Sequence, residues 1–416
     1  MKINYCSICW NPSNHPLGIT FDEKNICSGC IVHNERYSIN WSQRKKQIKK
    51  IFSNNYNSYY DCVIPVSGNG DDFFVVDYAK NELNLNPLIV NFNTHYNSKV
   101  GIRNMARLIS KLDCDHISMT ISPKVMRSLS RFTLDKIGDF YWPILAGQQA
   151  FPVQVALKFD IPFILWGVNG YLDQVGKFSH YNLVEMSKRI WEEFSCRGFE
   201  AHEIFEMQKN NIHFNLNDIN PLIYPNLSEI IKKNIRGIYL GNYIFWDSKL
   251  QSEKMIKKYG YETFKEQRTY NTYESIHCIH NSGMHDYNKF LKHGFCKVTD
   301  HVNRDIRYKR INREDGKHLI KCYSSLEPEN INILLEDLSI SRKFFYEKSL
   351  KFRFKYLQKF DYTTVKKSLN RTSKLKEIEE RINYQISDLL EPQSYKDKNI
   401  IFGRTYMDKN NFKSTE

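Results

Sequence analysis

Residues 59–74 read Tyr-Tyr-Asp-Cys-Val-Ile-Pro-Val-Ser-Gly-Asn-Gly-Asp-Asp-Phe-Phe. The apolar run at 62–66 predicts a buried strand, and residues 73–83 predict a helix. Between them lies a turn of small and acidic residues, 67–72. A strand, a glycine-rich turn and a helix can bind phosphate, because small residues let backbone N–H groups approach an anion at the helix N-terminus. An ordinary strand-to-helix turn has the same local pattern, so the rest of the chain must decide between the two.

The N-terminal region carries two closely spaced pairs of cysteines. They are Cys6, Cys9, Cys27 and Cys30. Each C-x2-C pair can present two thiolates to one tetrahedral ion, so this spacing predicts a closed, structural zinc site. Redox-active thiols are the competing interpretation. The residues between the pairs suggest a short hairpin.

Downstream of the first turn, apolar runs alternate with helical patterns. Further strands are expected at 87–92, 114–119 and 161–167, with helices at 98–112 and 146–159. This alternation predicts an α/β fold with a doubly wound parallel sheet. Ligands of such sheets bind at the carboxyl ends of the strands, so the segments after Val66, Phe92 and Trp166 should converge on one crevice.

Composition narrows the classes of protein that fit. The chain has 416 residues, 60 Lys and Arg against 46 Asp and Glu, and ten cysteines. Residues 342–381 hold 13 basic and 5 acidic residues, which is more than half of the excess charge. That segment would suit nucleic acid, an anionic membrane or a nucleotide-sugar, but solvated helix faces are the favoured explanation. The sequence has no transmembrane segment or signal peptide, so we expect a cytoplasmic protein with free or metal-bound thiols.

Several motifs together resemble the N-acetyl sugar amidotransferases, a branch of the PP-loop ATP pyrophosphatases. The resemblance covers most of residues 1–350. It rests on the four-cysteine ribbon, the Ser-Gly-x-Gly-Asp turn, and further motifs in order: Gly101-Ile102-Arg103-Asn104, Gly138-Asp139-Phe140-Tyr141-Trp142, Tyr224-Pro225, Gly237-Ile238-Tyr239-Leu240-Gly241, Trp246-Asp247, His285-Asp286-Tyr287, Asp305-Ile306-Arg307 and Arg313-Glu314-Asp315. It implies a sheet of the adenine nucleotide alpha-hydrolase-like type.

The expected domains follow from these motifs. They are a zinc ribbon at 1–33, a helical linker at 34–58, a PP-loop α/β ATP-binding domain at 59–260, a substrate-side helical region at 261–350, and a basic helical extension and tail at 351–416.

The resemblance implies an ATP-dependent reaction on the acetamido group of a nucleotide-activated sugar. ATP would adenylate the amide oxygen with release of pyrophosphate, and ammonia would displace AMP to leave an acetamidine. Because an amide is a poor electrophile, the adenylate supplies the leaving group. Ammonia would come from a partner glutamine amidotransferase subunit, since this chain shows no glutaminase motif. The products would enter lipopolysaccharide O-antigen or flagellar glycan. The expected cofactors are ATP, Mg²⁺ and Zn²⁺.

Candidate roles for individual residues follow from this chemistry. The cofactor-binding turn would be Ser67, Gly68, Asn69, Gly70, Asp71 and Asp72, with Asp71 reaching Mg²⁺. The catalytic candidates are Asp71, His285, Asp286 and Lys289. Substrate would be held by Arg103, Lys292, Asp305, Arg307 and Arg313, the arginines through bidentate contacts to a carboxylate or diphosphate. Each also has a structural alternative, as a paired charge or a satisfied buried histidine.

The turn departs from the family pattern Ser-Gly-Gly-x-Asp-Ser, in which x is Lys. Here Asn69 takes the third position, Gly70 stands for the Lys, and Asp72 stands for the last Ser. An acidic side chain pointing into a phosphate site would repel the anion by roughly 1–4 kcal/mol. Alternatively, Asp72 could cap the helix and leave the turn usable. After the fourth strand, Val168 and Asn169 stand where the family has Glu.

Three functions remain open at this stage. The first is the sugar amidotransferase itself, and the second is a catalytically degenerate homologue that acts as a scaffold or sugar-binding partner. The third is a tRNA-modifying PP-loop enzyme, since a zinc ribbon and basic charge also suit RNA. The five later cysteines, Cys114, Cys196, Cys278, Cys296 and Cys322, form no second C-x2-C pair. This argues against thiolation, so no nucleic-acid partner is expected.

Overall fold

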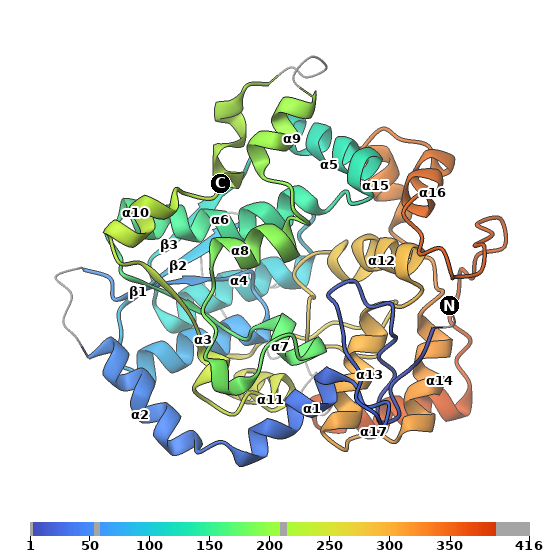
Figure 1. Cartoon of the computed structure of the whole chain (residues 1–416), viewed down its shortest axis with the longest axis horizontal. Coiled ribbons are helices and arrows are strands. Elements are labelled where there is room, and N and C mark those ends of the chain that lie inside the picture. The colour runs from blue at the N-terminus through green and yellow to red at the C-terminus, as the bar shows by residue number, and fades with distance from the viewer. Residues whose placement is uncertain (1–2, 54–58, 209–213, 388–416) are drawn as a thin grey trace, which may run out of the picture.

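A five-stranded parallel sheet forms the centre of the molecule in a computed structural model that describes residues 3–53, 59–208 and 214–387 (Figure 1). The strand order is β3-β2-β1-β4-β5. The strands are β1 (Cys62–Pro65), β2 (Pro87–Phe92), β3 (His116–Met119), β4 (Phe163–Trp166) and β5 (Arg236–Tyr239). The predicted doubly wound parallel α/β sheet is therefore confirmed, with β1 at its centre and the order reversing between β1 and β4.

The α-helices are distributed along the whole chain. Their bounds are α1 (Ser28–Glu35), α2 (Trp41–Phe52), α3 (Gly70–Asn81), α4 (Lys99–Leu112), α5 (Pro123–Ile137), α6 (Trp142–Lys158), α7 (Gly170–Val175), α8 (Lys188–Ile190), α9 (Ala201–Gln208), α10 (Leu227–Lys232), α11 (Ser248–Tyr259), α12 (Asp286–His293), α13 (Lys297–Arg307), α14 (Arg313–Tyr323), α15 (Ile331–Asp337), α16 (Arg342–Leu350) and α17 (Ser373–Ser387). Short 3-10 or π-helical turns lie at η1 (Arg36–Ser38), η2 (His180–Asn182), η3 (Trp191–Ser195), η5 (Leu216–Leu222), η6 (Leu240–Asn242) and η7 (Asn281–His285).

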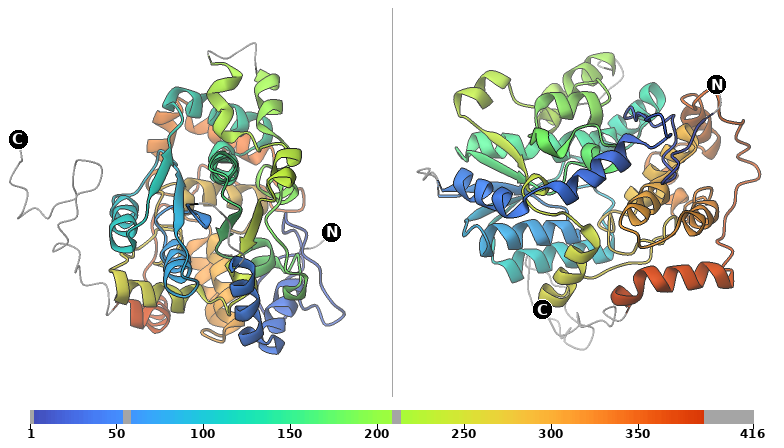
Figure 2. Two further views of the ribbon diagram at one scale, coloured as in Figure 1. Left: turned by 90° about the vertical axis from the view of Figure 1, so that its left-hand side faces the viewer. Right: turned by 60° about the horizontal axis from the view of Figure 1, so that its bottom comes forward.

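The two faces of the sheet bury alternate residues of each strand, as the period of a strand requires. Val63 of β1 packs in one core with α5 and α6, whereas Cys62 and Ile64 pack in the other with α3, α4 and α11. The two views in Figure 2 show these helices on opposite sides of the strands. This arrangement places the turn after β1 at the carboxyl edge of the sheet, where Gly68 lies against α4 and Gly70 lies against α11.

A third core joins the two ends of the chain. The four cysteines of the N-terminal region pack with apolar residues of α13, α14 and α17. Instead of the one hairpin expected between the cysteine pairs, two isolated antiparallel bridges close tight turns: Tyr5–Pro12 around the first pair and Phe21–Cys27 before the second pair, which lies at the start of α1. The predicted domain boundary at residue 33 remains a prediction, although α1 continues past it to Glu35.

The expected basic extension is only partly described. Residues 351–372 run along the surface without a helix, and α17 follows. The tail from 388 to 416 lies outside the described residues. None of the helices in the described part of the chain has the length and apolar character needed to cross a bilayer.

Candidate functional site

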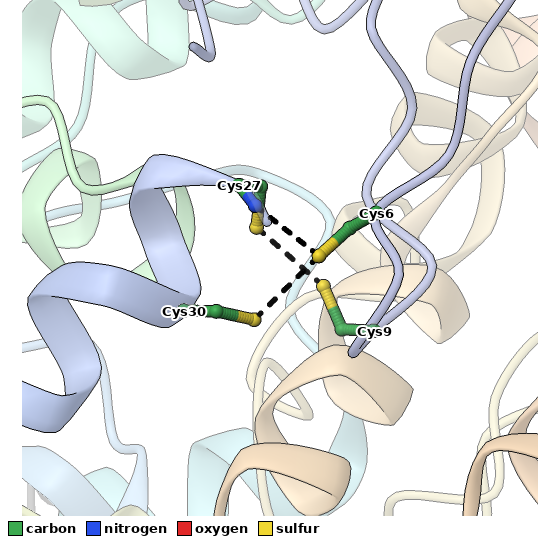
Figure 3. Close-up of side chains that lie close together, drawn as sticks. All are labelled: Cys6, Cys9, Cys27 and Cys30. Atoms are coloured by element: carbon green, nitrogen blue, oxygen red, sulfur yellow. Dashed lines mark hydrogen bonds between the residues drawn. The ribbon is translucent and has the colours of Figure 1, made fainter. Parts of the chain in front are cut away.

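The four cysteines of the ribbon form a compact cluster of buried thiols. Their sulfur atoms all lie within 4.8 Å of one another, with Cys6 and Cys30 sulfurs 3.9 Å apart and Cys9 and Cys27 sulfurs 3.6 Å apart (Figure 3). A tetrahedral zinc ion with Zn–S bonds of about 2.3 Å places its sulfurs about 3.8 Å apart. The donor set and its spacing therefore fit Zn²⁺.

Backbone N–H groups around the cluster point at the sulfurs, as expected for thiolates. The N–H of Ile8 lies 3.4 Å from the Cys6 sulfur, and that of Asn11 lies 3.5 Å from the Cys9 sulfur. Each donor follows its cysteine by two residues, which is the geometry that a tight C-x2-C turn imposes. These donors would stabilise negative charge on the sulfurs when a metal is bound.

The glycine-rich turn is filled by a side chain of its own. One carboxylate oxygen of Asp72 accepts hydrogen bonds from the backbone N–H groups of Ser67, Gly68 and Asn69 at 2.7, 2.8 and 2.9 Å, and from the Ser67 hydroxyl at 3.0 Å. Burial raises the pKa of Asp72, and these donors oppose that rise. The N–H groups that would cradle a phosphate thus converge on the Asp72 carboxylate.

Both alternatives considered for Asp72 are therefore partly realised. It caps α3 through a capping box with Asn69, and the same carboxylate occupies the anion position of the turn. A carboxylate and a phosphate cannot share these donors, because each is an anion that needs the same N–H groups. In this conformation the turn does not fit the phosphates of ATP.

Gly70, which stands at the family's Lys position, is closely surrounded. A Cβ atom there would lie 2.7 Å from the Ser252 hydroxyl and 2.9 Å from the Tyr261 ring. A side chain at this position requires that the Ser252 hydroxyl and the Tyr261 ring move, so the missing Lys is not restored by substitution at position 70 alone. Asn69 donates to His277 Nδ1 at 2.9 Å, and the side chains of Ser67, Asn69, Asp71 and Asp72 are half-buried.

Asp71 points away from the turn toward a group of charged side chains. Its Oδ2 lies 3.4 Å from the Ser248 hydroxyl, and its Oδ1 has no hydrogen-bond partner. Burial, with Glu274 nearby, raises the pKa of Asp71 to about 8, while Arg304 opposes the rise. Arg304 in turn is paired with Glu274 at 2.5 Å. A protonated carboxyl is a poor ligand for Mg²⁺, which prefers charged oxygen donors.

The end of β4 supplies no carboxylate to the crevice at the residues where the family has Glu. Asn169 caps α7 by accepting from the N–H of Tyr171 at 3.1 Å, and its buried Nδ2 has no partner. Asn169 therefore caps the start of α7, the helix that follows β4.

The catalytic candidates of the later segment point in different directions. His285 stacks on Tyr141 with ring centroids 4.4 Å apart and lies 3.6 Å from Asp139. Asp286 is buried and accepts from Arg268 Nε at 3.2 Å. Lys289 pairs with Asp300 at 2.6 Å. His285 ends η7, whereas Asp286 and Lys289 belong to α12, and each of the three side chains has a different partner.

Three of the expected substrate-binding residues have protein partners. Arg103 forms a two-pronged pair with Glu262, at 2.5 and 2.9 Å to one oxygen. Asp305 accepts from Tyr270 at 2.5 Å and from Arg310 at 3.1 Å. Lys292 is buried and donates to the Gly138 carbonyl at 2.7 Å. Burial lowers the pKa of Lys292 to about 7.

The other two candidates attach the four-cysteine ribbon to the helices. Arg313 donates to the carbonyl oxygens of Cys6 and Cys9 at 3.0 and 3.3 Å, and its guanidinium lies 3.7 Å from the centre of the Trp10 ring. Arg307 donates to the carbonyls of Asp173 and Gln174 at 2.9 and 3.0 Å. Both arginines therefore use their donors within the protein.

Sequence reasoning missed the pairs that cover the crevice. Arg36, which is almost completely buried, pairs with Asp173 of α7 and donates to the Trp246 carbonyl at 3.0 Å. Tyr308 accepts from Arg36 and donates to the same carbonyl at 2.5 Å. No local motif marks Arg36, because its partners lie more than 130 residues away. Asp139 was quoted only within a family motif, yet it is fully buried and paired with Arg197 at 2.6 Å.

Comparisons with known proteins bear on the second half of the chain. Residues 253–376 match the family model described as the C-terminal domain of WbpG-like LPS biosynthesis proteins. No curated protein matches.

Among solved structures, the chain is similar to an NH3-dependent NAD synthetase from Campylobacter jejuni subsp. jejuni in complex with the nitrate ion. The identity is 14%, the match covers 47% of this chain and 95% of that one, and the TM-score is 0.27. It is also similar to an NMN synthetase from Francisella tularensis, with 15% identity, 53% and 87% coverage and a TM-score of 0.26.

The matched segment begins in α11 and ends in α17, so it contains α12, α13 and α14 with all the later candidate residues. Residues 253–376 are therefore similar to the C-terminal domain of WbpG-like proteins, which confirms the resemblance in this part of the chain.

Proposed function

We propose that this protein is a degenerate sugar amidotransferase that acts as a sugar-binding or scaffold partner in lipopolysaccharide biosynthesis. The observation that carries the proposal is the Asp72 carboxylate in the phosphate position of the turn. The WbpG-like domain supports the pathway, and the state of the turn argues against ATP cleavage by this chain.

Two further features support the loss of ATP use. Gly70 replaces the Lys that would neutralise the phosphates, and its surroundings leave no space for a longer side chain. Asp71 has its pKa raised to about 8, so it would be largely protonated at pH 7 and would bind Mg²⁺ weakly.

A second candidate is the active ATP-dependent amidotransferase, with ammonia from a partner glutaminase. One observation favours it: the N–H groups of Ser67, Gly68 and Asn69 already converge on a single oxygen, so the cradle itself is preserved. ATP would have to displace Asp72 from three backbone donors. Each bond to a charged group is worth about 1.5–3 kcal/mol, so this displacement is costly.

The two candidates differ in a direct assay. Purified protein is incubated with ATP, Mg²⁺, ammonia and a panel of nucleotide-linked N-acetyl sugars, and pyrophosphate release is measured. The degenerate homologue should release no pyrophosphate with any sugar in the panel. Sugar-dependent release would instead establish the amidotransferase.

A further inference from the structure

The short helix α7 lies between the zinc ribbon and the crevice of the sheet. On the ribbon side, the Ser28 hydroxyl donates to the Val175 carbonyl at 2.6 Å, and Asn11 donates to the Gln174 carbonyl at 3.3 Å. On the crevice side, the Asp173 carboxylate pairs with the buried guanidinium of Arg36. In Figure 1, α1 and α7 lie next to each other beside the helices of the C-terminal domain. Movement of the ribbon would therefore be transmitted to the crevice through α7.

Arg307 of α13 connects the metal site directly to this helix. Its Nη2 donates to the Gln174 carbonyl at 3.0 Å and lies 3.8 Å from the Cys27 sulfur, and its Nη1 donates to the Asp173 carbonyl at 2.9 Å. A Cβ on Gly29 would lie 2.3 Å from Nη2, so the absence of a side chain at this position admits the guanidinium. One side chain thus contacts both the thiol cluster and the end of α7.

The negative charge expected at the metal site explains why the Arg307 guanidinium lies beside the cysteines. Four thiolates around Zn²⁺ leave a net charge of about −2, which is costly to bury without a nearby cation. Arg307 is 8% exposed, and its guanidinium faces the cluster.

We propose that Arg307 is a positioning residue of the metal site. Its charge balances the thiolates, and its hydrogen bonds hold α7 in place beside the crevice. The conformational order of α7 therefore depends on whether the metal is bound. This inference does not depend on whether the protein uses ATP. It concerns the zinc ribbon and the helix that follows β4.

The test compares Arg307→Gln with Arg313→Gln, a matched control. Arg313 carries the same charge and also attaches the ribbon, but it donates to the Cys6 and Cys9 carbonyls and not to α7. Zinc affinity is measured by competition with a chromogenic chelator. We expect Arg307→Gln to weaken zinc binding by roughly 10–100-fold, the range found for residues that support metal ligands. Arg313→Gln should weaken it less, and Arg307→Lys should recover part of the loss.

A second readout follows α7 itself by amide hydrogen exchange. In the parent protein, removal of zinc should increase exchange at residues 170–176 as well as in the ribbon. In zinc-loaded Arg307→Gln, exchange should increase at 170–176 while the ribbon stays protected. Equal zinc affinities for the two glutamine variants, or unchanged exchange at 170–176 on zinc removal from the parent, would overturn the proposal. The parent experiment decides even if Arg307→Gln does not fold.

Discussion

Replacing Asp72 with Ser, the residue of the family pattern, perturbs the turn most directly. The Asp72 carboxylate holds three backbone N–H groups and one hydroxyl at 2.7–3.0 Å. A serine hydroxyl can still cap Asn69, but it is too short to reach Ser67 and Gly68. Each lost bond to a charged acceptor is worth about 1.5–3 kcal/mol, and water entering the turn would replace part of it. We therefore expect the free energy of unfolding to fall by about 2–3 kcal/mol.

The same substitution should create an anion site. With the carboxylate gone, pyrophosphate can reach the N–H groups of the turn. At a concentration ten times its dissociation constant it would raise the free energy of unfolding of Asp72→Ser by about 1.4 kcal/mol. The parent protein should show no such rise, because its own carboxylate competes. The assay is urea unfolding at several pyrophosphate concentrations.

Asp77→Ser is the matched control for this experiment. Asp77 lies later on α3 and bonds to Lys258, Tyr259 and Asn81, away from the turn. It should also lose stability, but without gaining a response to pyrophosphate. The reasoning is refuted if pyrophosphate stabilises the parent as much as Asp72→Ser, or if Asp72→Ser unfolds at the same urea concentration as the parent.

Three further predictions concern the neighbouring features. The purified protein should contain one zinc ion per chain, and a strong chelator should lower its melting temperature; zinc-free protein that melts at the same temperature would contradict this. Gly70→Ala should lower the free energy of unfolding by about 1–3 kcal/mol through overpacking against Ser252 and Tyr261, and Ser252→Gly should relieve only the first of these two contacts. Gly170→Ala, whose Cβ meets nothing within 4 Å, should be nearly neutral in the same denaturant titration. Asp71 keeps its proton in the folded state up to about pH 8, whereas the unfolded chain loses it near pH 4. Its contribution to stability is thus lost as pH rises between these values. Asp71→Asn should therefore reduce the slope of the free energy of unfolding plotted against pH. An unchanged slope in this variant would exclude this role of Asp71.

The sheet was predictable because strands and helices alternate in sequence with clear periods. Residues 62–66 and 87–92 were assigned almost to the residue, since buried parallel strands are short apolar runs. Helix α5 was missed, because polar residues interrupt its apolar stripe. A strand was also expected from Ile238 to Asp247, but β5 begins earlier, at Arg236, and ends at Tyr239, where the chain turns into η6.

The site was less predictable, because its contacts join distant parts of the chain. The cysteine ligands follow from local spacing alone. In contrast, the partner of Arg103 is Glu262, and Arg307 meets a carbonyl of α7; neither pairing has a local signal. Asp72 was recognised as a departure from the family pattern. Its side chain points back over the turn to the Ser67 N–H, and that direction depends on the three-dimensional path of residues 67–72.

Calorimetric titration of the parent protein with MgATP tests the central claim, that the turn is occupied by its own carboxylate. We predict no detectable binding to the parent at millimolar MgATP, and measurable binding to Asp72→Ser. Tight binding of MgATP by the unmodified protein would contradict the account.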